Sequence, residues 1–459
     1  MKKVAFRCFA GVAASLVAIL GLTAAATASD KPPPEPAVVE EILRVLNEKG
    51  LLDEDEYSRL TARYTAAEKE RQSLLPKLKF YGDLRLRGEG FVYDDGDTPD
   101  QYRGRYRARL GVDAEVTDFA TVHFRIASSQ TQNNSPPGGD SRSENITFGY
   151  QPDWGPGPIY IDRAALELKA PATWVPLSDG KASVEVGKMG NPFIWKPIRD
   201  LLVWDSDIAP EGAAVRISGD VAKGLNVFFN GGYFIDDENA ASRDPHLIGT
   251  QIGASYKAAD TVVVGGRSTW YGFRSIDANF VCRGVNGKNC NGSPGSTVAG
   301  GNIAGGLTGS SDGGSINVGE FGLYTTISAF EDWPVTAWVD YSRNFSAESS
   351  ALYDTGTDAN AWNTGIVVGD RAKYLEIGFD YLFVEANALP SQMIESDWID
   401  GRSNHEAYVF WLTRRLFANT DLQGLVSFGD AIDDSLPAYQ NSVSGADRIR
   451  FQTDLSIAF

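Results

Sequence analysis

The sequence predicts an all-β fold: a transmembrane antiparallel β-barrel of about 16 strands, preceded by a short periplasmic helical segment. Three observations support this prediction. Apolar and polar residues alternate with a period of two from residue 79 onward, as a strand between oil and water requires. Short turns and long polar connections alternate as the links between these runs. The last run ends on Phe459, which is typical of chains assembled into the bacterial outer membrane.

The N-terminus predicts export. Lys2 and Lys3 precede an apolar run from Val4 to about Thr23, and Ala26-Thr27-Ala28 supplies a small-residue cleavage site, so we expect residues 1–28 to be a cleaved signal peptide. A spanning helix is the alternative, but the polar residues after position 28 favour removal. No later apolar run is long enough to cross a membrane as a helix. The formal net charge of −18 argues against nucleic-acid partners.

Two cysteines remain after removal of the signal peptide. Cys282 and Cys290 lie in a Gly/Asn-rich stretch, and in an exported chain such a pair favours a disulfide that closes a short loop. A metal site would need further ligands, and none is nearby. We therefore expect neither a metal nor a cofactor.

Residues 29–78 predict a proline-rich tether followed by a helical segment. An apolar stripe ends at Gly50, a candidate C-terminal cap. Asp53 and Glu56 then form a candidate capping box. Two alternatives remain for this segment: a solvated hairpin at the periplasmic rim, or a coiled coil that mediates oligomerisation or faces the cell wall. The residues at helical spacing are Val38, Ile42, Val45 and Leu46, then Tyr57, Leu60, Tyr64 and Ala67.

Residues 79–459 predict the barrel. Short links such as Thr117-Asp118 and Glu331-Asp332 would form one rim, and long polar links the other. A soluble β-sandwich, the alternative, would not explain arginines at every second position of a strand. The aromatics expected at the short-turn rim are Phe80, Phe119, Phe330, Trp333, Phe417 and Phe459. We expect strands near 80–92, 102–116, 119–129, 159–170, 181–189, 211–219, 223–234, 246–258, 260–272, 318–330, 333–345, 361–369, 372–385, 405–417, 418–430 and 446–459.

Arginines lie on the face of these strands that is opposite to the apolar side chains. Alternate residues of a strand are about 6.8 Å apart, so the four arginines at 103–109 predict a ladder roughly 20 Å long. Such a wall requires a water-filled lumen, because burying the cations in a dry core would be prohibitively costly. It would guide anions, or be neutralised by Asp83, Glu89, Asp113 and Glu115 on the same faces. The predicted pore-lining residues are Arg85, Arg87, Arg103, Arg105, Arg107, Arg109, Arg125, Arg448 and Arg450.

The link 190–210 differs from the others because it carries many large apolar residues, including two tryptophans. Folded inward it would bury them, narrow the pore and place three aspartates opposite the arginines. An alternative is Ca²⁺ binding by Asp205–Glu211, or by Asp94–Asp97 with Asp100. The predicted constriction residues are Lys196, Arg199, Asp200, Asp205 and Asp207.

Several segments resemble the bacterial outer-membrane "putative porin" family, which is akin to phosphate-selective porins. The resemblance implies a passive, often trimeric pore in outer-membrane lipid that passes small hydrophilic solutes or anions. The alternatives are an adhesin or surface-binding barrel and a barrel lipid hydrolase, for which no outward Ser/His pair is evident among His123, His246 and His405. The segments that carry the resemblance are Ile42 to Leu60, Phe80-Tyr81-Gly82-Asp83-Leu84-Arg85-Leu86-Arg87, Arg105-Tyr106-Arg107-Ala108-Arg109-Leu110-Gly111, Gly187-Lys188-Met189-Gly190-Asn191-Pro192-Phe193, Leu202-Val203-Trp204-Asp205 and Glu395-Ser396-Asp397-Trp398.

Overall fold

The chain forms two compact units, residues 1–76 and 77–459, which we describe separately. The predicted signal peptide, the two cysteines and the acidic turn 94–97 lie outside the described residues. The computed structural model describes residues 36–74, 77–93, 99–129, 143–149, 152–236, 238, 243–276, 314–330, 332–349, 356–391, 393–399, 401–433 and 448–459.

The first unit contains the two helices α2 (Pro36–Glu48) and α3 (Glu54–Leu74). After α2, Gly50 adopts a φ of +68°, and the Leu51 N–H donates to the Leu46 carbonyl at 2.9 Å, a glycine-capped helix end. The Asp53 carboxylate accepts from the Glu56 N–H at 2.7 Å, and the Glu56 carboxylate accepts from the Asp53 N–H at 3.4 Å. These contacts form the predicted capping box. None of the described helices is both long and apolar enough to span a membrane.

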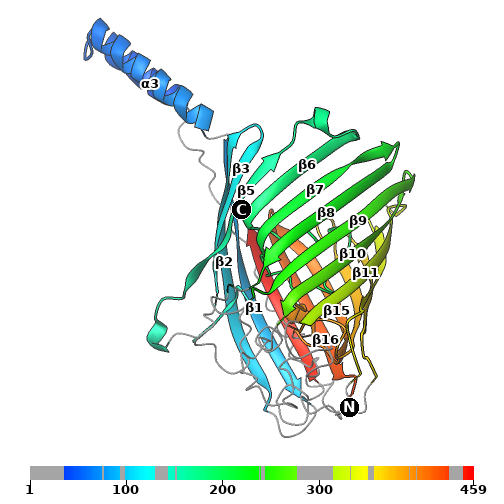
Figure 1. Ribbon diagram of the computed structural model, residues 1–459. Coiled ribbons are helices and arrows are strands. Elements are labelled where there is room, and N and C mark those ends of the chain that lie inside the picture. The colour runs from blue at the N-terminus through cyan, green and yellow to red at the C-terminus, as the bar shows by residue number, and fades with distance from the viewer. Residues whose placement is uncertain are drawn as a thin grey trace. The chain divides into compact units, whose positions relative to one another are not determined.

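The second unit is a closed antiparallel barrel of sixteen strands, supplemented by the two-residue β4 (Figure 1). It closes because β1 pairs with both β2 and β17. All sixteen predicted strands are present, with ends within a few residues of those expected. The bounds are β1 Leu78–Tyr93, β2 Gln101–Thr117, β3 Ala120–Ser128, β4 Ile146–Thr147, β5 Ile159–Lys169, β6 Ser178–Lys188, β7 Glu211–Ala222, β8 Leu225–Ile235, β9 His246–Ala259, β10 Val262–Ile276, β11 Gly314–Ile327, β12 Val335–Asn344, β13 Asn360–Gly369, β14 Glu376–Val384, β15 His405–Phe417, β16 Thr420–Ala431 and β17 Arg448–Ala458. Short helical turns lie at Pro152–Trp154, Ala172–Trp174 and α5 (Ser396–Ile399).

The two faces of the strands differ as the alternation predicts. On β1, Leu86 is 43% exposed on the outer face, whereas the next residue, Arg87, is 4% exposed inside. Strand β17 shows the same difference between its two faces, because Ile457 is exposed and Asp454 is buried. Apolar side chains therefore cover the outside and charged side chains point inward, the arrangement of a barrel that spans a membrane.

Tight turns join the strands at one rim, as between Thr117 and Ala120 or between Phe417 and Thr420. All six aromatic residues predicted for this rim are at least 40% exposed. Aromatic rings at this level match the aromatic girdle of a membrane interface. In Figure 1 this rim lies at the top, and the longer connections lie at the bottom.

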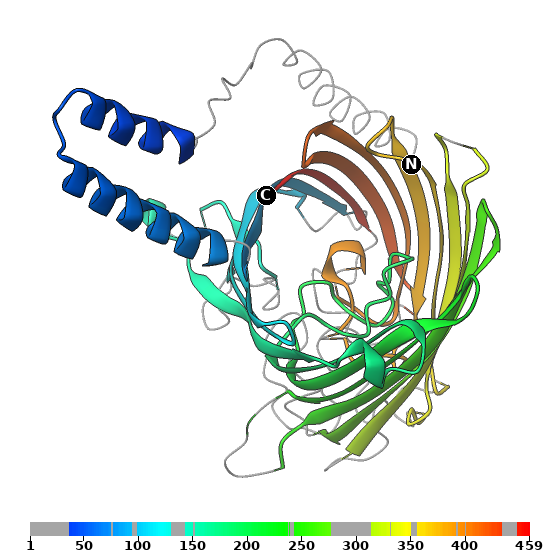
Figure 2. The same ribbon diagram turned by 90° about the horizontal axis from the view of Figure 1, so that it is seen from above.

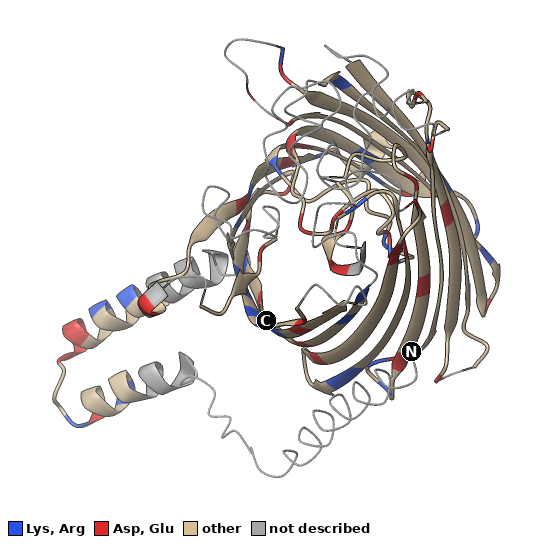
Figure 3. Ribbon diagram, turned by 90° about the horizontal axis from the view of Figure 1, so that it is seen from below, with Lys and Arg blue, Asp and Glu red and all other residues tan. Residues whose placement is uncertain are grey.

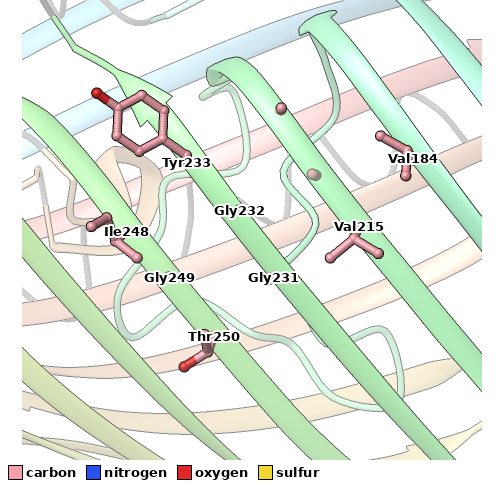
Figure 4. A pocket seen from close by; sticks show the side chains of 10 residues that line it. Val184, Val215, Gly231, Gly232, Tyr233, Ile248, Gly249 and Thr250 are labelled. Atoms are coloured by element: carbon pink, nitrogen blue, oxygen red, sulfur yellow. The ribbon is translucent and has the colours of Figure 1, made fainter.

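The outer face of β6–β9 carries a hollow of about 340 Å³ (Figure 4). It forms where Gly231 has no side chain between its neighbours Val215 and Thr250. Val184 and Ile248 at its edges are exposed on the same outer face. The hollow therefore faces lipid and is separate from the lumen.

Candidate functional site: the barrel lumen

The predicted arginine wall lies on the inner faces of β1, β2, β3 and β17. Pairing of β1 with β2 places Arg85 opposite Arg107 and Arg87 opposite Arg105. Arg103 and Arg109 continue the same face of β2, since residues two apart share a side. Arg125 lies on β3, whereas Arg448 and Arg450 lie on β17 beside β1.

Carboxylates on the same strands neutralise much of this wall. Glu89 is 4% exposed and accepts hydrogen bonds from Arg103, from Arg105 at 3.5 Å and from Arg450 at 3.0 Å. Asp83 lies between two further arginines in the same way. Its oxygens are 3.0 Å from Nη2 of Arg107 and 2.5 Å from Nε of Arg109. These contacts support neutralisation by Asp83 and Glu89. Asp113, in contrast, binds His123.

The segment 143–145 folds against the wall from inside the barrel. Arg109 donates to Glu144 at 3.1 Å, Arg85 donates to Asn145 at 2.8 Å, and Arg105 donates to the Ser143 hydroxyl at 2.9 Å. Burial, and secondly the nearby Asp207 carboxylate, raise the pKa of Glu144 to about 8. This segment could not be predicted from the sequence, because its three polar residues show no periodicity.

The connection 190–210 folds into the barrel, as its apolar composition predicts (Figure 2). Phe193 and Leu202 are fully buried. The Phe193 ring packs edge-on against Tyr271 of β10 at 5.4 Å, and its carbonyl accepts from Gln251 of β9 at 2.8 Å. Burial of each such side chain contributes about 1.5–3 kcal/mol, so this loop is held firmly against the wall.

A buried cluster of charges anchors the same loop. Arg267 on β10 binds Asp200 of the loop, with Nη2 2.7 Å from Oδ1, and also Glu320 at 2.8 Å and Asp340. Among the described residues, these three carboxylates form the one group close enough to hold a metal ion. The Arg267 guanidinium lies among them and supplies the positive charge a metal would bring, so the cluster fits an ion-pair anchor better than a metal centre.

A second inward segment, 393–397, joins the first. The Asp205 N–H donates to the Met393 carbonyl at 2.6 Å, and the Ser206 N–H donates to Glu395 at 3.1 Å. In return, the Asp205 carboxylate accepts from the Ser396 N–H at 3.1 Å. Burial, followed by the charge of Asp397, raises the pKa of Glu395 to about 7. The two loops therefore form one unit inside the lumen.

Asp397, at the start of α5, connects this unit to the arginine wall. Its carboxylate is 2.6 Å from Nη1 of Arg87 on β1 and 3.4 Å from Nη2 of Arg450 on β17. Arg450 also donates to the Asp397 carbonyl at 2.7 Å. Asp454 completes the pairing of Arg87 with a second carboxylate, 2.7 Å from its Nε.

The five predicted constriction residues lie in different environments. Asp207 faces the wall as expected, 3.5 Å from Arg107. The expected position of the other two aspartates was wrong, because Asp200 pairs with Arg267 and Asp205 holds backbone N–H groups. Those N–H bonds, including one from Asp207 at 2.9 Å, occupy the Asp205 oxygens that the Ca²⁺ alternative would use. Of the cations, Arg199 lies 4.1 Å above the Trp411 ring, and Lys196 is exposed.

Basic and acidic positions are therefore intermixed along the lumen (Figure 3). The Arg103 side chain is the most accessible of the paired wall arginines, with 30% of its surface exposed, whereas that of Arg87 retains 2%. Such a surface offers hydrogen bonds and mild fields to water-borne solutes. In the described part of the chain, His123 binds the carboxylates of Asp113 and Glu167, His246 binds the Asp244 carbonyl, and Nδ1 of the buried His405 has no hydrogen-bond partner.

Residues 95–344, more than half of the chain, match the protein family described as "Putative porin". The chain belongs to this porin family. Among solved structures, OprB of Pseudomonas putida at high pH is similar, with a TM-score of 0.51 and 12% identity over 85% of this chain and 96% of that chain. This likeness agrees with the barrel fold of the porin.

Two further solved structures cover much of the porin with lower similarity. The outer-membrane channel DcaP of Acinetobacter baumannii has a TM-score of 0.44 and 11% identity, over 83% of this chain and 97% of that chain. A loop-deletion variant of OmpT from Vibrio cholerae has a TM-score of 0.43 and 13% identity, over 83% and 99%. No curated protein matches the sequence. The family and the barrel together place the porin in the bacterial outer membrane as a channel protein.

Proposed function

We propose that this porin is a water-filled channel for passive diffusion of small hydrophilic solutes and ions, with a mild preference for anions. The observation that carries the proposal is the concentration of arginines on one inner wall of a barrel whose outer face is apolar. Their pairing with Asp83, Glu89 and the inward loops limits the net field, so the preference is mild. An uncharged solute would then pass according to size.

The inward loops support a constriction on this wall. Asp207 and Asp397, on the inward loops, pair directly with Arg107 and Arg87 of the wall, so opposite charges meet inside the lumen. Opposed charges at a narrow point order water and orient dipolar solutes. A general diffusion channel with such a transverse field would favour small charged or zwitterionic solutes over apolar ones.

Reversal potentials in a salt gradient across a planar bilayer test the preference. Arg107→Ser leaves Asp83 and Asp207 with less compensating charge, so the anion-to-cation permeability ratio should fall. A unit charge about 5 Å from an ion in water contributes about 0.8 kcal/mol before screening, with opposite sign for anions and cations, which corresponds to a change in the ratio of at most roughly 15-fold. Asp83→Asn is the matched control and should raise the ratio. Unchanged potentials in both variants would reject the anion preference, and absence of conductance would reject the channel.

Two parts of the proposal concern assembly. We expect a homotrimer, on the resemblance stated above, and export directed by residues 1–28. The helical unit, with Ile42 and Leu51 exposed, would lie in the periplasm. Crosslinking of the purified porin, compared with a variant lacking residues 29–76, would show whether that unit contributes to the oligomer.

A further inference from the structure

A β-bulge on β5 turns two consecutive side chains into the lumen. In the pairing with β3, Arg125 lies opposite Arg163 and the next residue, Ile126, lies opposite Ile161, so Asp162 is an extra residue. Ile161 is 56% exposed on the outer face, whereas Asp162 is 8% exposed and binds Arg125. Bulges commonly re-aim a side chain in this way. Here the bulge places Arg163 on the inner face directly after an inward carboxylate.

Arg163 carries a positive charge that no neighbour neutralises. Asp162, the carboxylate beside it, is bound to Arg125. Glu185 on β6 is likewise bound to Arg216. Within the described part of the chain Arg163 forms no hydrogen bond or ion pair, and its Nε is buried without a partner. The buried Nε therefore lacks an acceptor, and an unpaired buried donor costs about 1–3 kcal/mol.

The surroundings of Arg163 supply further donors. Its guanidinium lies beside Gly190, where the inward loop begins, and an added Cβ on Gly190 would be 3.2 Å from Nη1. Arg216 reaches the Gly190 carbonyl from the other side at 3.2 Å. The next loop residue, Asn191, has a buried side-chain Nδ2 that is also without a partner. The other groups acting on Arg163 are Tyr81, Arg109, Arg125 and Asp162, of which the three ionised side chains are already paired.

We propose that Arg163 forms a discrete binding site for a small oxyanion at the base of the inward loop, with Arg216 beside it. The planar guanidinium presents two parallel N–H groups that match two oxygens of one anion. Gly190 keeps the approach open, because a side chain there would contact the guanidinium. The site rests on the proposed water-filled lumen for its supply of anions. An anion would bind at this one site, whereas the arginines of the wall are already paired with carboxylates.

Sulfate serves as the probe, in two measurements on the full-length porin. In bilayers, chloride current is recorded while sulfate is added at constant chloride and constant ionic strength, so that screening does not change. The current should fall to a plateau with a defined half-saturation. In detergent, sulfate should raise the unfolding temperature with the same concentration dependence, since a ligand that binds only the folded state stabilises it.

Arg163→Gln should raise the sulfate concentration at half-saturation roughly tenfold, the effect of losing a charge-assisted contact. Arg163→Lys keeps the charge but loses the pair of parallel N–H groups, so its half-saturation concentration should lie between those of the wild type and Arg163→Gln. Arg343→Gln on the outer face of β12 removes the same charge outside the lumen and should leave the value unchanged. Equal sulfate responses in Arg163→Gln and Arg343→Gln, or no saturation in the wild type, would overturn the site. If the porin conducts no current, the channel proposal fails and the detergent titration alone decides the site.

Discussion

The contact between Asp200 and Arg267 should control how often the inward loop opens. Asp200→Asn removes one charge at nearly constant volume, and Glu320 and Asp340 continue to pair with Arg267. The change therefore reports on the loop contact and leaves no unpaired buried cation. Hydrogen bonds to charged groups contribute about 1.5–3 kcal/mol each, and part of the two bonds to Asp200 persists in asparagine. We expect a loss of roughly 2–4 kcal/mol in docking free energy.

Thiol labelling measures that loss. Val203 is 1% exposed in the docked loop, so Val203→Cys, in a background with Cys282 and Cys290 replaced by Ser, reacts only after undocking. A loss of 2–4 kcal/mol should speed labelling by roughly 30- to 700-fold. Asp332→Asn at the short-turn rim breaks an exposed pair with Lys373 and should change the rate less than threefold. An Asp200→Asn rate as slow as the wild type would refute the anchor.

Two further predictions follow from the inward loops and the barrel wall. Because the pKa of Glu395 is raised to about 7, its contribution to loop docking is full below about pH 4.5 and is lost as the pH rises through 7. Labelling of Val203→Cys, corrected for the reactivity of a free thiol, should therefore accelerate between pH 5 and pH 8, and Glu395→Gln should remove this dependence. An added Cβ on Gly378 of β14 would overlap the Trp411 indole, so Gly378→Ala should cost about 1–3 kcal/mol and lower the folded fraction seen by electrophoresis without heating. Gly424→Ala, with open space around its Cβ, is the matched control, and equal folding of the two variants would contradict this packing argument.

The barrel could be predicted from the sequence because every strand obeys the same local rule. Period-two alternation is set by contact with lipid on one side, and it locates sixteen strands without knowledge of their neighbours. The inward fold of 190–210 was also predictable from the sequence, since its apolar residues need burial. Segments 143–145 and 393–397 were not predicted to fold inward, because their positions depend on arginines that are distant in sequence.

The charge pairing was harder to predict for a related reason. Arg267, Glu320 and Asp340 are single polar residues on three different strands, and only the register of the sheet brings them together. Arg163 did leave a signal. The aliphatic residues exposed on β5 are Ile159 and Ile161, then Leu166 and Leu168, and this change from odd to even positions indicates an extra residue between them. Arg163 was not among the pore-lining residues predicted from the sequence.

Asp397 has a consequence for the completion of the barrel. The first strand, β1, pairs with the last, β17, and this seam closes the barrel. Asp397 binds Arg87 on one side of the seam and Arg450 on the other, and its segment is hydrogen-bonded to the inward loop 190–210 through Asp205 and Met393. Separation of β1 from β17 therefore requires that Asp397 release at least one of these arginines. Closure of the barrel and docking of segment 393–397 are thereby coupled.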